Sequence, residues 1–395
     1  REIAPLRILC LRAVGHKSCD AEQTFQIKDE VTKSSASRLL QSFHIAEHIT
    51  REPFFGGAAS NRRADANEID LNHPFIATRN TFAEFGNAAL DCLQTYIDSL
   101  IELGRLDDSR LGINFWNEWK KNVIISSKKR KRTEGSNLAS LSLHNGSICD
   151  DTVDAMIQSG MGKYVAVLDL TGTNTLTDSL VNKLLATMPK LQRLSLKNCR
   201  RLTIKSLLSI TKFSPALTCL DIGGSYNIKA TDLLDVLPLL SNLDELYAGG
   251  LGWTDFTLLQ VSELRSWKGL GFGFSIDLTP SGFREAMKNQ PHLERLAVPF
   301  CEQALDSSLL GFLGRTLPGV TSLDIRGNTG VTSLTSWFDG RASIGAPAQE
   351  LFVLARYSNL SKASLEETKR IHPIHAVELT CILDGKGVGQ GIHRM

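Results

Sequence analysis

The sequence predicts an α/β solenoid, in which short parallel strands line a concave side and helices cover a convex side. The pattern L-x-x-L-x-L recurs over residues 138–383 of the 395-residue chain, with spacings of 23 to 27 residues. Each copy is followed by apolar residues three or four apart, which is the spacing of a helix face. One strand and one helix cannot bury their own apolar sides, so the copies must stack on one another.

The composition is that of a globular chain, with 42% apolar and 22% charged residues. A net charge of +2 favours neither nucleic acid nor an anionic membrane as partner, and no run of 18 apolar residues could span a bilayer. Eight cysteines without a CxxC pair predict neither a zinc framework nor a disulfide scaffold. We therefore expect no metal, no cofactor and a reducing compartment. A first residue of Arg1 rather than Met is compatible with a fragment.

Residues 1–126 form a helical N-terminal region that we expect to be partly disordered, because residues 15–75 are polar and weakly periodic. Helical spacing of apolar residues predicts helices over 80–104 and 109–124. The sequence HIAEH at 44–48 matches the H-x-x-E-H zinc motif. It has no convincing downstream ligand, so we interpret it as the surface of a polar helix.

A basic linker over 127–137 separates this region from the repeats, and its five consecutive cations repel one another and stay solvated. We interpret them as a nuclear import signal, with a plain charged linker as the alternative. Few aromatic residues lie between the cations to stack on bases, so nucleic acid is an unlikely partner. The five residues are Lys128, Lys129, Arg130, Lys131 and Arg132.

The repeat copies are predicted over 138–383, and most have similar residues where the helix begins and where it ends. Thr177, Thr203 and Thr332 stand where a side-chain oxygen would cap the following helix. Prolines two residues before several copies end the helix and favour the extended chain that follows. The predicted copies start at Leu138, Val165, Leu191, Leu217, Leu243, Leu270 (a degraded copy), Leu293 and Val320.

Small or polar residues dominate the ninth position of the copies, where Cys199 and Cys301 stand. We interpret both as buried structural thiols, since free cysteines are usually buried. The pattern, the period near 26 and this cysteine resemble leucine-rich repeats of the ribonuclease-inhibitor-like superfamily, in the cysteine-containing subclass typical of F-box proteins. The resemblance implies a right-handed horseshoe that binds proteins. It also implies a substrate receptor of an SCF-type cullin ubiquitin ligase.

The periodicity weakens after Val320. We predict an inserted loop over 335–350, and a strand from Leu351 in which Arg356 replaces the third leucine. A helix capped by Ser364 is predicted over 364–371, followed by a closing strand over 376–383 and a flexible glycine-rich tail over 384–395. An atypical last repeat is expected at the exposed end of a solenoid.

We expect function to lie on the concave face, where the variable strand positions face outward and aromatic and arginine side chains are the strongest anchors. The candidate partner-binding residues are Asp169, Arg193, Lys197, Asp221, Glu245, Tyr247, Arg295, Phe300, Asp324 and Arg326. No catalytic constellation emerges, so an enzyme is not predicted.

Three roles follow from this organisation. If the N-terminal helices are a divergent F-box, a cullin adaptor would dock on Leu93, Ile97, Leu100 and Trp119. If instead they only cap the solenoid, the protein is a nuclear scaffold, for example in chromatin or DNA repair. A regulator of a small GTPase is the third role and would need a catalytic-support arginine such as Arg193 or Arg326.

Overall fold

The computed structural model describes residues 97, 112–129, 139–146, 148, 150–373 and 379–382. The chain forms two compact units, Arg1–Leu191 and Gln192–Met395. Most of the predicted helix over 80–104 lies outside the described residues, as do the HIAEH sequence and the tail over 384–395. No helix within the described ranges is long and apolar enough to cross a membrane.

The first unit contains two strands, β1 and β2, which pair in parallel, and several helices. Helix α7 packs against α8 and η3 and buries Phe115, Trp116 and Trp119. This helix was predicted over 109–124, but it begins at Ile113 and continues to Lys129, so that the first two cations of the basic segment are helical. The elements are α7 Ile113–Lys129, β1 Ala139–Ser142, α8 Asp150–Ser159, η3 Met161–Tyr164, β2 Val165–Asp169 and α9 Asp178–Leu185.

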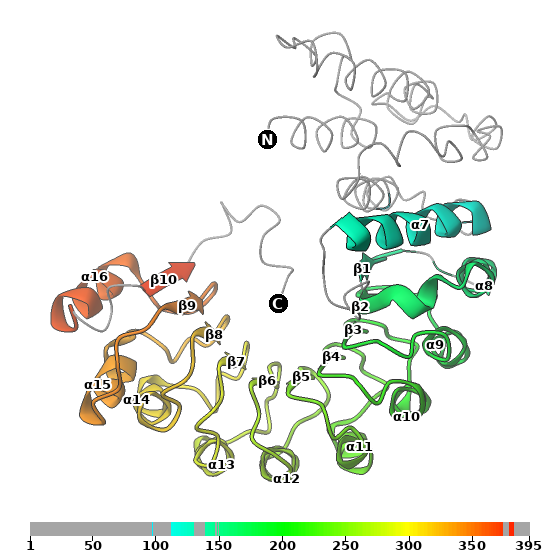
Figure 1. Cartoon of the computed structure of the whole chain (residues 1–395). Helices are drawn as coiled ribbons and strands as arrows, with labels where there is room; N and C mark the ends of the chain where they lie inside the picture. Colours follow the sequence, from blue (N-terminus) through cyan, green and yellow to red (C-terminus); the bar gives the residue numbers. More distant parts are fainter. Residues whose placement is uncertain are drawn as a thin grey trace, which may run out of the picture. The chain divides into compact units, whose positions relative to one another are not determined.

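The second unit is a leucine-rich-repeat solenoid, in which each strand pairs in parallel with the next strand along the chain. Within this unit the strands line the inner side of the curve and the helices the outer side (Figure 1). The strands are β3 Arg193–Ser195, β4 Cys219–Asp221, β5 Glu245–Tyr247, β6 Gly269–Gly271, β7 Arg295–Ala297, β8 Ser322–Asp324, β9 Leu351–Leu354 and β10 Leu379–Ile382. The helices are α10 Ile204–Phe213, α11 Ala230–Val236, η4 Leu237–Leu239, α12 Asp255–Glu263, α13 Pro280–Met287, α14 Ser307–Thr316, α15 Thr335–Ser343 and α16 Lys362–Ile371.

The ninth position points into the core in the described copies except the last, where Ser358 is half-buried, and Cys199 and Cys301 are buried, as predicted. The buried residues at this position tie adjacent turns together. The amide of Cys301 donates to Asn328 Oδ1 at 2.8 Å, and Asn328 Nδ2 donates to the carbonyl of Val298 at 2.8 Å. These bonds satisfy backbone groups that the turn would otherwise bury without partners.

Two of the three predicted threonine caps are confirmed. Thr177 and Thr203 accept hydrogen bonds from the first-turn amides of α9 and α10. Thr332 is not a cap, because α15 begins only at Thr335 and its N-cap residue is Leu334. Helix α16 is capped by Ser361 rather than Ser364, which instead completes the capping box from the third helical position.

The degraded copy starts three residues earlier than predicted. Leu270 pairs with Leu246 and Leu296, the second leucines of the neighbouring copies, so the first position of this copy is Trp267. Trp267 is fully buried and donates its indole N–H to the carbonyl of Val261 at 2.9 Å. An aromatic residue in place of the first leucine hid the pattern, and the true spacings on either side are 24 and 26 residues.

Residues 335–350 are not the loop that was predicted, because α15 occupies their first half and buries Trp337 and Phe338. The register of β9 is also shifted by one residue. Val353 pairs with Leu323, which places the buried Ala355 at the third apolar position and Arg356 one residue beyond it. This part of the chain is therefore an ordinary repeat helix and strand, although its glycine and proline residues favoured a loop in the prediction.

Candidate protein-binding face

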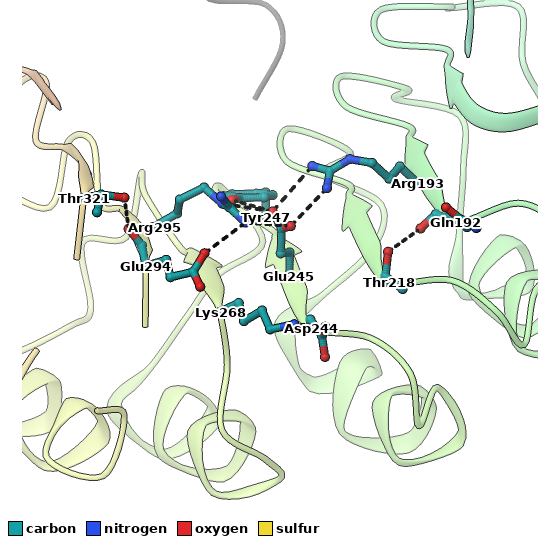
Figure 2. Close-up of polar contacts among 10 residues, drawn as sticks. All are labelled: Gln192, Arg193, Thr218, Asp244, Glu245, Tyr247, Lys268, Glu294, Arg295 and Thr321. Atoms are coloured by element: carbon teal, nitrogen blue, oxygen red, sulfur yellow. Dashed lines mark hydrogen bonds and ion pairs between the residues drawn. The ribbon is translucent and has the colours of Figure 1, made fainter. Parts of the chain in front are cut away.

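A buried carboxylate organises the centre of the concave face (Figure 2). Glu245 lies on β5 with only 7% of its side chain exposed, between Arg193 of β3 and Arg295 of β7. Arg193 Nη1 lies 3.0 Å from Glu245 Oε1, and Arg295 contacts both carboxylate oxygens, Nη2 to Oε1 at 2.9 Å and Nε to Oε2 at 3.2 Å. One carboxylate thus holds two guanidinium groups from strands on either side of it.

Tyr247 completes this arrangement and lies over the glycine-rich strand β6. Its hydroxyl donates to Glu245 Oε2 at 3.1 Å. A Cβ at Gly269 would lie 2.7 Å from the Tyr247 hydroxyl, and one at Gly271 would lie 2.7 Å from the ring. Glycine is therefore required on β6 because the tyrosine occupies the space in which a side chain would stand.

The electrostatics of this group, here called the arginine–glutamate cluster (Arg193, Glu245, Tyr247 and Arg295), favour fixed charges. Burial alone would raise the pKa of Glu245, but the hydrogen bond from Arg193 and the two arginine charges outweigh it and hold the pKa below its usual value. Burial and the neighbouring carboxylate raise the pKa of Tyr247, which stays neutral. The cluster thus carries two positive charges and one negative charge.

Cys219 on β4 lies close to the cluster but has no catalytic character. It is buried, and burial raises its pKa to about 12, so the thiolate that would act as a nucleophile is not formed near neutral pH. Among the described residues no group of three or more His, Cys, Asp or Glu side chains could hold a metal ion.

The other charged residues predicted on the concave face partly serve their own turns. Asp169, Asp221 and Asp324 each accept a hydrogen bond from the amide two residues on, at 3.0, 3.0 and 3.2 Å. Arg326 forms an ion pair with Asp324 at 2.5 Å, whereas Lys197 is exposed. These three aspartates therefore stabilise the backbone of the turn that follows each strand.

Sequence reasoning placed the charged members of the cluster but missed what joins them. The three glycines on and after β6, Gly269, Gly271 and Gly273, were hidden by the wrong start of that copy. Lys268 was not among the predicted residues. It lies directly before β6 and forms an exposed ion pair with Asp244 at 2.8 Å (Figure 2). A correct alignment of the degraded copy would have shown glycine at the two positions of β6 that pair with Glu245 and Tyr247.

The residues predicted to dock an adaptor and to direct nuclear import lie apart from this face in the sequence. Ile97 and Trp119 are buried, with 0% and 2% of their surfaces exposed. Leu93 and Leu100 lie outside the described residues, as do Arg130, Lys131 and Arg132. Lys128 and Lys129 form the end of α7. Both roles stay predictions.

No protein-family model and no curated protein matches the chain. Solved structures that resemble it include a chain of the Rad7–Elc1 complex of yeast, with 18% identity, a TM-score of 0.42 and coverage of 62% of this chain and 68% of that one. LegL7 of Legionella pneumophila, a leucine-rich-repeat protein, has 18% identity, a TM-score of 0.39 and coverage of 62% and 74%. TLR13 in complex with ssRNA13 has 16% identity, a TM-score of 0.38 and coverage of 63% of this chain but only 36% of its own.

Proposed function

We propose that this chain is a protein-recognition module, which binds an acidic region of a partner on the concave face of its second unit. The arginine–glutamate cluster carries the proposal. Arg193 and Arg295 keep 38% and 32% of their side chains exposed while sharing the single carboxylate of Glu245. A guanidinium has five N–H donors, and its planar fork matches a carboxylate, so each arginine retains donors for a second acidic group.

Preorganisation is the physical reason to place binding here. Contacts to Glu245 restrict both arginine side chains before a partner arrives, which reduces the side-chain entropy lost on binding. Tyr247, held by its hydrogen bond to Glu245 and close to the glycines of β6, adds an aromatic surface beside the arginines. A net charge of +1 in the cluster favours a partner group of negative sign.

The finer hypothesis is that the module is the substrate-recognition subunit of a cullin-type ubiquitin ligase. It is supported by the cysteine-type repeat, with Cys199 and Cys301 buried at the ninth position, and by the helical segment before the repeats. In this role the concave face would bind the substrate and the N-terminal helices the adaptor. A nuclear scaffold would use the same face without an adaptor.

Affinity purification of the tagged full chain from cells, with mass spectrometry, tests both the protein-recognition proposal and the ligase hypothesis. The bait is compared with a double variant, Arg193→Gln and Arg295→Gln, and with Lys268→Ala, which removes an exposed cation on the same face. Circular dichroism melting establishes that each variant is folded. Protein partners lost only with the double variant would support recognition by the cluster, and partners indifferent to it would refute that role. Cullin and adaptor must co-purify with the parent chain, or the ligase hypothesis is wrong.

A further inference from the structure

The turn after each strand contains one residue in the left-handed backbone region, at the eighth position of the copy. Glycine and asparagine adopt this conformation readily, and six of these nine described turns use one of them. Three turns of the second unit instead place a bulky aromatic residue there, at a cost in backbone strain. The residues are Asn145, Gly172, Asn198, Gly224, Gly250, Phe274, Phe300, Gly327 and Tyr357, with φ between 54° and 80°.

The three aromatic residues lie next to one another and form what we call the aromatic ridge (Phe274, Phe300 and Tyr357). The rings of Phe274 and Phe300 stack with centroids 4.8 Å apart and an angle of 20°, and Phe300 lies 6.5 Å from Tyr357. Between the last two, Gly327 leaves room for the Phe300 ring, because a Cβ there would lie 2.2 Å from it. The ridge therefore runs across four consecutive turns at the rim of the concave face.

The fold does not require aromatic side chains at the three ridge positions. Phe274 is 59% exposed and Tyr357 75% exposed, so neither belongs to the core. The same turn forms around Gly224 and Asn198, which shows that no aromatic ring is needed for it. Exposed apolar surface combined with backbone strain is typical of a site that contacts another molecule.

We propose that the aromatic ridge anchors large apolar side chains of an acidic segment of a protein partner. This inference rests on the proposed function, because it assigns the same partner a second contact. The acidic character follows from the cations on the concave side of the ridge. Arg356 directly precedes Tyr357, and no ion pair among the described residues involves it. Arg326 directly precedes Gly327, in the turn between Phe300 and Tyr357, and shares its charge with Asp324. An apolar side chain on the rings would place neighbouring carboxylates near these arginines.

A protein segment fits the surroundings of the ridge better than a single-stranded nucleic acid. Stacked rings also bind bases, but the phosphates need cations along the whole strand. Asp277 and Glu302 are exposed three and two residues after Phe274 and Phe300, and they would repel phosphates. A peptide can present acidic groups near the arginines and basic or neutral groups near these two carboxylates.

The test selects phage-displayed random 12-residue peptides on the full chain, and then measures fluorescein-labelled synthetic copies of the enriched peptides by fluorescence polarisation. The variants are Phe274→Asn and Tyr357→Asn, because asparagine occupies the same position in other turns and relieves the strain. Phe256→Ala on α12 is the control, since Phe256 is 65% exposed but lies away from the ridge. Anchoring residues at an interface commonly contribute tenfold or more, so each ridge variant should weaken binding by about tenfold.

Enriched peptides that combine acidic and large apolar residues, and that bind the parent and Phe256→Ala chains alike but the ridge variants tenfold more weakly, support the proposal. Peptides that ignore the ridge variants but lose affinity with Arg193→Gln overturn the ridge while the proposed function stands. Peptides that depend on the ridge but not on Arg193 argue against the proposed function instead. No enrichment at all, or ridge-dependent binding of a labelled dT20 oligonucleotide, overturns the proposal.

Melting temperature gives an independent readout. If the ridge serves binding, Phe274→Asn should melt at or above the temperature of the parent chain, because strain is relieved and little buried surface is lost. A marked fall in melting temperature would show that ring stacking stabilises the fold, and that outcome counts against the proposal.

Discussion

Replacement of Glu245 by glutamine should destabilise the second unit, because it removes the negative charge that offsets the repulsion between the two guanidinium groups. Hydrogen bonds to charged groups contribute about 1.5–3 kcal/mol when buried, whereas exposed ion pairs contribute at most about 1 kcal/mol. Glu245 is 7% exposed but its partners are a third exposed, so the loss lies between these limits. We expect Glu245→Gln to cost about 2 kcal/mol, or roughly 4–8 °C in melting temperature for a unit of this size.

The pH dependence makes the prediction specific to the charge. The pKa of Glu245 in the folded chain is below its ordinary value of 4.5, so its stabilisation is fully present above 4.5 and is lost as the pH falls through the folded pKa. The difference between parent and variant, measured by thermal melting, should therefore be largest near neutral pH and disappear at low pH.

A neighbouring carboxylate supplies the control. Asp244→Asn removes an exposed ion pair with Lys268, which solvent screens, and should leave the melting temperature almost unchanged. If Glu245→Gln melts like the parent at neutral pH, or if the difference persists unchanged in acid, the charge of Glu245 does not hold the cluster together and the reasoning fails.

Three further predictions concern the same unit. Gly271→Ala should cost about 1–3 kcal/mol in urea unfolding, because its Cβ would displace Tyr247, and no loss would show that the ring is not confined there. Trp267→Ala should cost about 3–5 kcal/mol whereas Lys268→Ala should leave the stability almost unchanged, and equal effects would contradict the corrected register. Cys301, whose pKa burial raises to about 11, should resist iodoacetamide at pH 8 until the chain is denatured, as peptide mass mapping can measure.

Two errors of the sequence-based prediction, at the copies of β6 and β9, share one cause, which is the replacement of a repeat leucine by another residue that packs in the core. Trp267 fills the place of a leucine, and Ala355 that of another, so the leucine pattern alone misaligned both copies. The segment after Val331 contains glycine and proline that favour a loop, but burial of Trp337 and Phe338 stabilises α15. Tertiary packing decided these elements because local propensity there was weak.

The sequence by itself determined the repeat, because each copy buries its own apolar residues against its neighbours and the pattern must recur wherever the core does. It therefore also determined which strand positions face outward and that Cys199 and Cys301 are buried. Only the tertiary structure decided that Arg193 and Arg295 meet on Glu245, and that three left-handed aromatic residues lie next to one another on one rim. Such contacts join residues about 25 or 50 positions apart, and they depend on the register between copies. A one-residue change in that register would separate them, and the spacing of leucines does not fix it where a copy is degraded.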